Sequence, residues 1–236
     1  MERSLAAIGR LESIAQVLQL SRDHAVQRGV IRQSYHFTPI FDGPTSPRTI
    51  VQSEGFSPEW LELYARSDFR RADPIPARTL QHGAMLPWRE AMALDSNTPE
   101  NEHYFAAMAE HGLIHGFGVP LFGPHGRDAY ASFDFGRPVG EVDERDMASV
   151  CSLAQIGHLR ICALIEQERD KPMLSARESE VLQWMARGKS NTDIATILEL
   201  SPETVRTYVQ RIYGKLGSHE RVVAIVRALK LGLVEY

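Results

Sequence analysis

Residues 174–217 read LSARESEVLQWMARGKSNTDIATILELSPETVRTYVQRIYGKLG, and this stretch is divided by signals that start and stop short helices. Serine is preferred just before the first helical turn because its hydroxyl accepts a hydrogen bond from a backbone N–H there. Glycine ends helices because it adopts the left-handed conformation without steric cost. The residues at such positions are Ser175, Gly188, Ser190, Ser201 and Gly217. They predict three short helices in succession.

The apolar side chains of these helices recur at helical spacing. The second helix is expected to bury Ile194, Ala195, Ile197 and Leu198. The third has one apolar face, made by Val205, Tyr208, Val209, Ile212 and Leu216. Ser218 is expected to cap a fourth helix that ends at Gly232, with a buried stripe formed by Val222, Val223, Ile225, Val226 and Leu229. Residues 174–236 therefore predict a small all-α domain.

Only the brief turn at residues 199–201 separates the second helix from the third, as in a helix-turn-helix. The third helix is polar on its other face, where arginine and glutamine can pair with base edges in a major groove. Threonine, lysine and the N–H groups at a helix start suit phosphates. The residues predicted to contact DNA are Lys189, Ser190, Thr204, Arg206, Thr207, Gln210, Arg211 and Lys215. The alternative is the solvated face of an ordinary helical bundle.

The charge of the chain is unevenly distributed. Its 236 residues include 26 Lys and Arg and 30 Asp and Glu, and this net charge of −4 taken alone argues against a nucleic-acid partner. From Lys171 onward there are 10 basic and 7 acidic residues, which leaves 16 and 23 for the residues before it. The C-terminal part is thus weakly basic, at +3, and the rest carries −7. The excess of +3 is modest, so charge alone leaves DNA binding and the solvated face of a helical bundle about equally open.

Many residues between positions 174 and 233 stand at fixed offsets from one another. They are Arg177, Glu178, Glu180, Val181, Leu182, Gly188, Lys189, Ser190, Ile194, Ala195, Ser201, Thr204, Val205, Ile212, Lys215, Leu216 and Arg221. This set resembles the DNA-binding domain of LuxR-type transcriptional regulators, in which Glu178, Leu182 and Gly188 would be structural. Tyr208 departs from the family, which usually has histidine there, and because it lies on the apolar face we expect altered packing rather than lost DNA binding.

The N-terminal part of the chain mixes helical and strand patterns. Helices are expected over residues 3–20, from Ser57 and Pro58 onward, around 99–111 and over 141–167. Strands are expected at 34–41, 48–52, 116–122 and 129–135, and the last two are joined by the turn-rich GPHGRD as an antiparallel hairpin. The fold class is therefore α+β, an N-terminal α-β-α sandwich with an antiparallel sheet followed by an all-α four-helix helix-turn-helix domain.

A sandwich of this kind can enclose a small molecule between its sheet and its helices. The aromatic and acidic residues that suit such a site are Trp60, Tyr64, Asp73 and Trp88. Pro74 and Gly116 belong to the same set. Without further context, core aromatics and an Asp-Pro turn are the favoured interpretation of these residues. Their spacing, however, resembles the set that marks the acyl-homoserine-lactone-binding domain of LuxR-type quorum-sensing receptors. The two resemblances together cover nearly all of the chain.

This second resemblance implies a role for each matching residue. Trp60 would donate its indole N–H to the lactone carbonyl, and Asp73 would accept the amide N–H of the ligand. Tyr64 would line the acyl chain and Trp88 the lactone ring. Pro74 and Gly116 would be structural. A carboxylate in a mostly apolar pocket is costly unless a donor satisfies it, so the ligand amide would complete the site.

Phe56 is a departure, because many of these receptors have a tyrosine there whose hydroxyl helps to hold the acyl carbonyl. That contact is lost here, and Ser132, on the inward side of the last predicted strand, is a candidate replacement. Ile75 makes the surroundings of Asp73 more apolar than usual. These changes leave the acyl group open, including a bulky or aromatic one.

The expected domain limits are 1–165 for the ligand-binding domain, 166–173 for a linker and 174–236 for the DNA-binding domain. The segment EQERDKP at residues 166–172 favours a linker because it has no large apolar side chain and ends in proline. Cys151 and Cys162 lack metal-ligand spacing and are typical of core thiols in a reducing compartment.

The expected location is the cytoplasm. No stretch approaches the roughly 20 apolar residues of a membrane span. The N-terminal apolar run is interrupted by Arg10 and Glu12, unlike a signal peptide, and no membrane partner is expected. No cofactor or metal ion is expected besides the lactone ligand. A homodimer on palindromic double-stranded DNA and contact with RNA polymerase follow from the family resemblance, with the helix at 141–167 and the fourth tail helix as candidate dimer contacts.

Three alternatives remain open or are set aside on sequence grounds. The alternative that remains open is an orphan regulator of the same type, which senses another small molecule or binds DNA without ligand. An enzyme using Asp73 as a general base is the rival from another class, and no nucleophile motif supports it. Gly188-Lys189-Ser190 ends like a phosphate-binding loop, but the first glycine of that motif would fall at Gln183.

Overall fold

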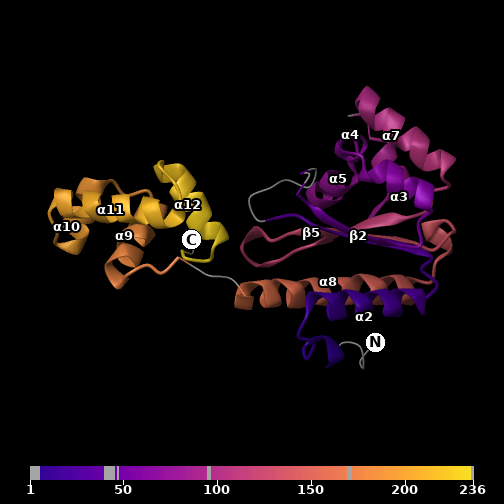
Figure 1. The fold of residues 1–236 in the computed structure, drawn as a ribbon, viewed down its shortest axis with the longest axis horizontal. Coiled ribbons are helices and arrows are strands. Elements are labelled where there is room, and N and C mark those ends of the chain that lie inside the picture. The colour runs from indigo at the N-terminus through magenta and orange to yellow at the C-terminus, as the bar shows by residue number, and fades with distance from the viewer. Residues whose placement is uncertain (1–5, 40–45, 47, 95–96, 169–171, 235–236) are drawn as a thin grey trace. The chain divides into compact units, whose positions relative to one another are not determined.

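The computed structural model describes residues 6–39, 46, 48–94, 97–168 and 172–234 of the chain. The chain divides into two compact units, Met1–Gln167 and Glu168–Tyr236. The larger unit consists of helices around a sheet, and the smaller unit consists of helices alone (Figure 1). The predicted α+β fold class is therefore confirmed.

The larger unit is built on an antiparallel sheet with the strands β1 (Arg32–Phe37), β2 (Ile50–Glu54), β3 (Leu86–Pro87), β4 (Phe117–Leu121) and β5 (Ala129–Asp134). Their order across the described sheet is β2-β1-β5-β4-β3. Strands β4 and β5 form the predicted hairpin, in which Leu121 pairs with Ala129. The two-residue strand β3 was not predicted. Ile40 and Phe41, which end the first predicted strand, lie outside the described residues.

Helices cover both faces of the sheet, with α2 (Ile14–Val26) and α8 (Glu144–Glu168) running along one of them (Figure 1). Val17 of α2 and Ile161 and Leu164 of α8 form a buried cluster there. The helix expected over residues 3–20 is divided. Residues 6–8 are helical, and after a turn the hydroxyl of Ser13 accepts from the N–H of Gln16 and begins α2. Residues 3–5 lie outside the described part of the chain.

The other face of the sheet carries shorter helices. These are α3 (Pro58–Ala65), α4 (Ser67–Arg71), α5 (Ile75–His82), α6 (Trp88–Met92) and α7 (Pro99–Glu110). Helices α3 and α7 begin where predicted, capped by Ser57 and Thr98. Helices α4, α5 and α6 were not predicted, because so short a helix presents little periodic pattern unless a capping serine marks its start, as Ser57 does for α3. The Asp-Pro pair introduces α5 rather than a simple turn, and Pro74 is its N-cap.

Helix α8 meets the length and composition of a membrane span over Glu144–Gln167, and it is the one such helix among the described residues. The expectation that no stretch of the sequence approaches a membrane span is therefore wrong for this helix. The helix is 44% buried over its most apolar window, and Val150, Leu153 and Ile161 are almost fully enclosed by the larger unit. A helix that buries one face against a sheet in this way is typical of a core helix.

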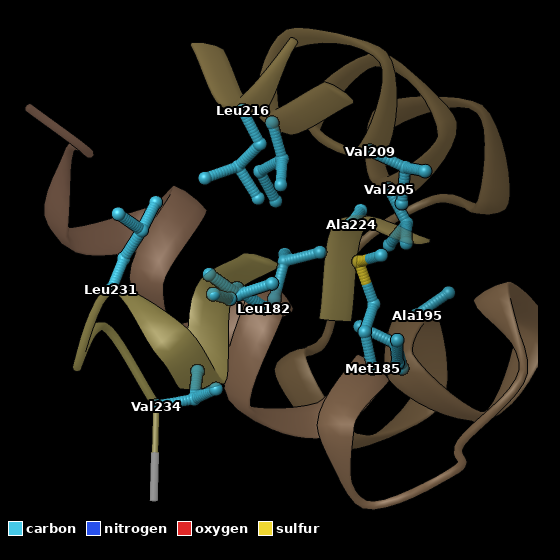
Figure 2. Close-up of a cluster of buried hydrophobic side chains, with 13 residues drawn as sticks. Leu182, Met185, Ala195, Val205, Val209, Leu216, Ala224, Leu231 and Val234 are labelled. Atoms are coloured by element: carbon cyan, nitrogen blue, oxygen red, sulfur yellow. The ribbon is translucent and has the colours of Figure 1, made fainter. Parts of the chain in front are cut away.

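The smaller unit contains α9 (Ala176–Ala186), α10 (Asn191–Leu198), α11 (Pro202–Leu216) and α12 (Arg221–Lys230). The three predicted serine caps are confirmed, and Ser175 and Ser190 each form a reciprocal capping box. One core joins all four helices (Figure 2), and its buried members are Val181, Leu182, Met185, Ile194, Ala195, Val205, Val209, Ile212, Leu216, Ala224, Ala228, Leu231 and Val234.

The predictions for α12 were wrong in two respects. Its N-cap is Glu220 rather than Ser218, whose hydroxyl instead accepts from the N–H of Glu220 in the preceding turn. The residues buried within the helix are Ala224 and Ala228, whereas Val222 is 70% exposed. Small alanines let α12 approach its neighbours closely. Of the predicted stripe, Ile225 and Leu229 are partly buried against the core, whereas the three valines are exposed. Among the described residues of the unit, the exposed large apolar side chains are Met173, Ile197, Val222, Val223 and Val226.

Candidate functional sites

One small cavity lies between the sheet and the short helices of the larger unit. Its volume is about 40 Å³. All seven residues predicted to bind ligand line it: Phe56, Trp60, Tyr64, Asp73, Ile75, Trp88 and Ser132. They come from α3, α5, α6, β5 and the connections between elements, so the fold assembles residues that are far apart in the sequence. Ligand sites commonly measure about 300–1,000 Å³, and a small molecule can therefore enter only if these side chains move apart.

Asp73 is the acidic group of this cavity and is 4% exposed. Its Oδ2 accepts from the hydroxyl of Tyr64 at 2.8 Å, and its Oδ1 accepts from the N–H of Ile75 at 2.9 Å. The phenol of Tyr104, from α7, is a further neighbour that favours the ionised carboxyl. Burial raises the pKa of Asp73 to about 6, because loss of water outweighs these donors and the nearby Arg70. The carboxyl of Asp73 therefore changes its protonation state around pH 6.

Aromatic rings surround this carboxyl. Trp60 is held by α3, whose cap Ser57 accepts from its backbone N–H, and its ring centroid lies 6.0 Å from that of Tyr64 and 5.9 Å from that of Tyr104. Trp88 is buried at the start of α6, and its indole N–H points to the hydroxyl of Tyr130 at 3.4 Å. The cavity thus has an aromatic wall on the helices and a second one next to the sheet.

Gly116 has a structural role that the geometry explains. Its carbonyl accepts from the backbone N–H of Trp88 at 2.9 Å, and a Cβ atom on Gly116 would lie 2.5 Å from the Trp88 ring. No real Cβ contact is that short, so any larger residue would displace the indole from the cavity wall. Glycine at this position therefore determines where Trp88 lies.

Sequence reasoning missed five polar residues of the cavity, among them Ser53 of β2. Tyr104 and Tyr130 supply hydroxyls next to Asp73 and Trp88, while Ser34 and His36 of β1 line the sheet side. Tyr130 precedes Ser132 by two positions on β5, so strand alternation alone places both on one face. The position of Tyr104 on α7 had no such signal, since the helix packs against α3 and α4 only in the folded domain.

A larger cavity, of about 250 Å³, lies on the opposite side of the sheet between α2, α8 and the β1–β2 edge. None of the seven predicted ligand residues lines it. Several of its polar groups are already paired within the protein, since Arg22 pairs with Glu54 and the hydroxyl of Tyr35 bonds to His158 at 2.8 Å. Size alone therefore does not identify the functional cavity, and the chemistry favours the smaller one.

In the smaller unit, α10 and α11 form a helix-turn-helix. Glu199 adopts the left-handed conformation at the end of α10, with φ of 54°, and Ser201 caps α11 by accepting from Thr204 N–H at 3.1 Å. Four predicted DNA contacts are exposed side chains of α11: Arg206, Thr207, Gln210 and Arg211. The guanidinium of Arg211 lies over the ring of Tyr208, 5.9 Å from its centroid, which restricts its conformations.

The other predicted DNA contacts are partly occupied by bonds within the domain. The hydroxyl of Ser190 donates to Asp193 at 2.7 Å, and that of Thr204 bonds to Ser201 at 2.7 Å. The side chain of Lys189 is exposed. The ammonium of Lys215 donates to the carboxylate of Glu178 at 2.6 Å and to the carbonyl of Met173 at 2.9 Å. Lys215 therefore connects the end of α11 to the start of α9. The sequence pattern, which placed Lys215 on the polar face of the helix, did not indicate this role.

Replacing Lys215 by methionine is expected to destabilise the smaller unit by roughly 1–2 kcal/mol, because the buried Glu178 carboxylate loses its charged donor. Hydrogen bonds from Lys215 and Ser175 lower the pKa of Glu178, so this stabilisation is present above the unfolded pKa of the carboxyl and is lost as pH falls through the folded one. Hydrogen exchange in α9 and α11 of the full chain measures the change. Equal protection in wild type and variant at pH 7 would contradict it.

The two units together define a ligand-sensing DNA-binding regulator. Residues 13–161 match the model of the autoinducer binding domain, and residues 172–228 match that of bacterial regulatory proteins of the luxR family. The chain belongs to the LuxR family of quorum-sensing transcriptional regulators, with an autoinducer-binding domain followed by a DNA-binding helix-turn-helix domain. Members of this family are transcriptional regulators and not enzymes, and their autoinducer domain takes a small-molecule ligand rather than a cofactor.

Individual relatives agree with this assignment. The quorum sensing-dependent regulator RpaR of Rhodopseudomonas palustris is 29% identical over 193 residues, covering 78% of this chain and 75% of RpaR. The regulator RhlR of Pseudomonas aeruginosa is 28% identical over 204 residues, covering 80% and 78%. A putative transcriptional regulator of Sinorhizobium fredii, y4qH, is 31% identical over 178 residues, and the match spans 75% of this chain but only 54% of that protein.

The fold is also that of a solved structure. Escherichia coli SdiA superimposes with a TM-score of 0.76 at 22% identity, covering 100% of this chain and 98% of SdiA. SdiA in complex with octanoyl-rac-glycerol gives a TM-score of 0.71 at 21% identity, with coverage of 100% and 96%. At these identities the comparison shows that the fold is shared.

Proposed function

We propose that this regulator binds an N-acyl-homoserine lactone in the small cavity and, as a homodimer, binds a palindromic promoter site to control transcription. The observation that carries the proposal is that Trp60, Tyr64, Asp73 and Trp88 converge on one buried cavity. An acidic acceptor beside indole rings matches a ligand with an amide N–H and a lactone carbonyl. The domain limits we propose are 1–165 for ligand binding, 166–173 for the linker and 174–236 for DNA binding. Helix α8 continues to Glu168, so the linker begins in helical conformation.

Each cavity residue has a proposed contact. Trp60 donates to the lactone carbonyl, Asp73 accepts the amide N–H, and Tyr64 and Trp88 enclose the acyl and lactone groups. Phe56 has no hydroxyl for the acyl carbonyl. Ser132 is 3% exposed on β5 and lines the same cavity, which supports it as the replacement donor. Ile75 adds an apolar side to the Asp73 environment.

The DNA contacts we propose are Arg206, Thr207, Gln210 and Arg211 on α11, with Thr204, Lys189 and Ser190 near phosphates. Their exposure on one side of the helix-turn-helix supports this assignment. With a net charge of only +3 from Lys171 onward, one domain binds DNA weakly, and two copies on a twofold-symmetric site supply the affinity. We further propose that the bound dimer acts by contacting RNA polymerase, in the cytoplasm.

The dimer would use apolar surfaces that the single chain leaves exposed. On α8, Leu159 is 46% exposed together with Ile156, and on α12 the exposed residues are Val222, Val223 and Val226. Leu159→Glu and Val226→Lys are expected to shift the protein toward monomer in sedimentation velocity, because each would place an unpaired charge in a dry interface. Glu180→Lys, which changes the charge of an already paired surface residue, is the control. A dimer unaffected by both changes would refute this surface assignment.

The experiment that tests the proposal is expression of the full chain with and without a panel of N-acyl-homoserine lactones. Ligand that binds only the folded domain stabilises it by RT ln(1+[L]/Kd), or about 2.7 kcal/mol at a hundredfold excess over Kd. We expect a raised melting temperature and recovery of the intact lactone by mass spectrometry. An unshifted melting temperature across the panel, with DNA binding retained, would instead support the orphan regulator that senses another molecule or none.

Ligand affinity is expected to rise with pH through the pKa of Asp73, which is about 6, because the ionised carboxylate is the better acceptor for the amide N–H. The folded pKa lies above the unfolded value of 3.8, so the empty domain gains stability from Asp73 at low pH and loses it as pH rises through 6. Isothermal titration between pH 5 and 8 measures the first effect, and thermal melts measure the second. A pH-independent Kd in wild type would contradict the assigned contact, and Asp73→Asn is expected to remove both dependences.

A further inference from the structure

The larger cavity of the N-terminal unit, of about 250 Å³, lies between the sheet and the helices α2 and α8. Its sheet side includes residues that are paired in register, since Tyr35 of β1 lies opposite Gln52 of β2 and opposite Ala131 of β5. Cross-strand partners point to the same face, and successive residues of a strand alternate between faces. Ala131 therefore faces away from its neighbour Ser132, which lines the small cavity, and the two cavities lie on opposite faces of the sheet.

Small residues leave this space between the sheet and the helices. Ala131 is 2% exposed on the central strand β5, and Ala154 and Gly157 line the cavity from α8. The two helices touch at Gly157, where a Cβ atom would lie 2.9 Å from Ser21 Oγ of α2. Interiors are normally close-packed, and a cavity lowers stability in proportion to its volume because its walls lose van der Waals contacts. A molecule that restores these contacts is therefore favoured here.

The buried part of the lining is apolar or already hydrogen-bonded. Phe133 and Ile161 are 5% and 2% exposed. The hydroxyl of Tyr35 donates to Nδ1 of His158 at 2.8 Å, and Nε2 of His158 donates to the carbonyl of Arg127 at 2.7 Å. Burial lowers the pKa of His158, so the imidazole stays neutral and can accept from Tyr35. This part of the cavity therefore suits the hydrocarbon part of a ligand.

The exposed part of the lining is polar, and its charges are paired. Arg22 of α2 forms an ion pair with Glu54 of β2. Nε2 of Gln33 lies 3.4 Å from the carbonyl of Arg22, which is a long hydrogen bond. Among the described residues, Oε1 of Gln33 and the amide of Gln52 have no hydrogen-bond partner. Because an amide both donates and accepts, this rim suits a neutral polar head better than a carboxylate or an ammonium group.

We propose that this cavity is a second ligand site, which binds a small neutral amphiphile with its alkyl part against Leu18 and Phe133 and its amide or hydroxyl head at Gln33 and Gln52. A cavity of about 150 Å³ accommodates benzene, so this volume suits about ten non-hydrogen atoms. The inference goes beyond the lactone-binding function and does not depend on it. A ligand in this cavity stabilises the packing of α2 and α8 on the sheet.

The test titrates the full chain with octanamide, 1-nonanol and octanoate, each of about ten non-hydrogen atoms, by isothermal titration at about pH 8, where octanoate is ionised. The amide and the alcohol distinguish the two neutral head groups. We expect at least one of them to bind saturably with a Kd below about 1 mM, and octanoate to bind at least about tenfold more weakly.

Larger side chains at the cavity wall are expected to exclude the neutral ligand. Ala154→Leu and Ala15→Leu should each weaken its binding by at least about tenfold, because the added atoms occupy the cavity. Ala148→Leu is the matched control, since Ala148 is an exposed residue of α8 that does not line the cavity. Ala15 is exposed on α2, so Ala15→Leu carries the test if Ala154→Leu fails to fold.

Methyl NMR of the full chain locates the bound molecule. We expect octanamide or 1-nonanol to shift the methyl signals of Leu18 and Ile161 and to leave that of Ile75, in the small cavity, unchanged. A shift at Ile75 without shifts at Leu18 and Ile161 would overturn the inference and leave the proposed lactone site untouched. Absence of saturable binding by both neutral molecules, equally tight binding of octanoate, or an unchanged Kd in Ala15→Leu would overturn it as well.

Discussion

Asp73→Ala is expected to raise the lactone concentration needed for half-maximal reporter output by about 10- to 100-fold, or to abolish the response within the accessible range. A hydrogen bond to a charged group contributes about 1.5–3 kcal/mol, which corresponds to that factor. The hydroxyl of Tyr64 also loses its acceptor at 2.8 Å, and the N–H of Ile75 loses the one at 2.9 Å. The loss is therefore larger than that of the ligand contact alone. A reporter dose-response curve and the ligand-induced melting shift measure it.

Asp73→Asn is the control that keeps the shape of the side chain. It is expected to weaken ligand binding. The empty domain should be at least as stable as wild type at neutral pH, because burying a neutral amide avoids the free-energy cost of burying a charge. Helices α9 to α12 belong to the other compact unit and should retain their hydrogen-exchange protection in both variants. An unchanged dose response in Asp73→Ala would remove the cavity from consideration as the lactone site.

Arg211→Ala is expected to reduce affinity for the proposed palindromic site by about 100-fold or more, because in the proposed dimer the substitution removes the same contact from both half-sites. One good arginine contact to a base is worth about 1–3 kcal/mol, and the two copies act together. The side chain is exposed and lies over Tyr208, so its removal should leave the stability of the domain unchanged. Fluorescence anisotropy with labelled operator DNA at several salt concentrations measures the change.

The salt dependence identifies the kind of contact. If Arg211 meets a phosphate, the slope of log K against log salt falls by about one for each copy, whereas loss of a base contact relaxes sequence preference and leaves the slope similar. Arg177→Ala is the charge-matched control, because Arg177 lies on α9 and pairs with Glu180 at 2.7 Å. A loss of affinity in Arg177→Ala as large as in Arg211→Ala would show that net charge alone is responsible.

The sequence predicted the smaller unit well because its signals are local. Serine caps and terminal glycines act within one helical turn, so α9, α10 and α11 begin where expected. Helix α12 was misjudged because its apolar residues surround the helix and only packing decides which face is buried. The bond from Lys215 to Glu178 spans 37 positions along the chain, and no local pattern carries that information.

In the larger unit, the pattern predicted the hairpin, the long helix and the seven cavity residues, the last through family spacing rather than through physical necessity. It missed Tyr104, Tyr130, Ser34 and His36, which meet in the cavity only once the strands are ordered β2-β1-β5-β4-β3. Strand order and helix docking are set by tertiary packing, and alternation within one strand indicates a face without naming its partners.

The tightness of the small cavity has a consequence for timing. On the proposed assignment, a cavity with about 40 Å³ of free space is too small for the lactone, so its lining side chains must move apart each time a ligand enters or leaves. Capture and release are then both governed by the frequency of this opening, and occupancy outlasts brief changes in the surroundings. Such a receptor averages the concentration of its signal over time and ignores momentary fluctuations.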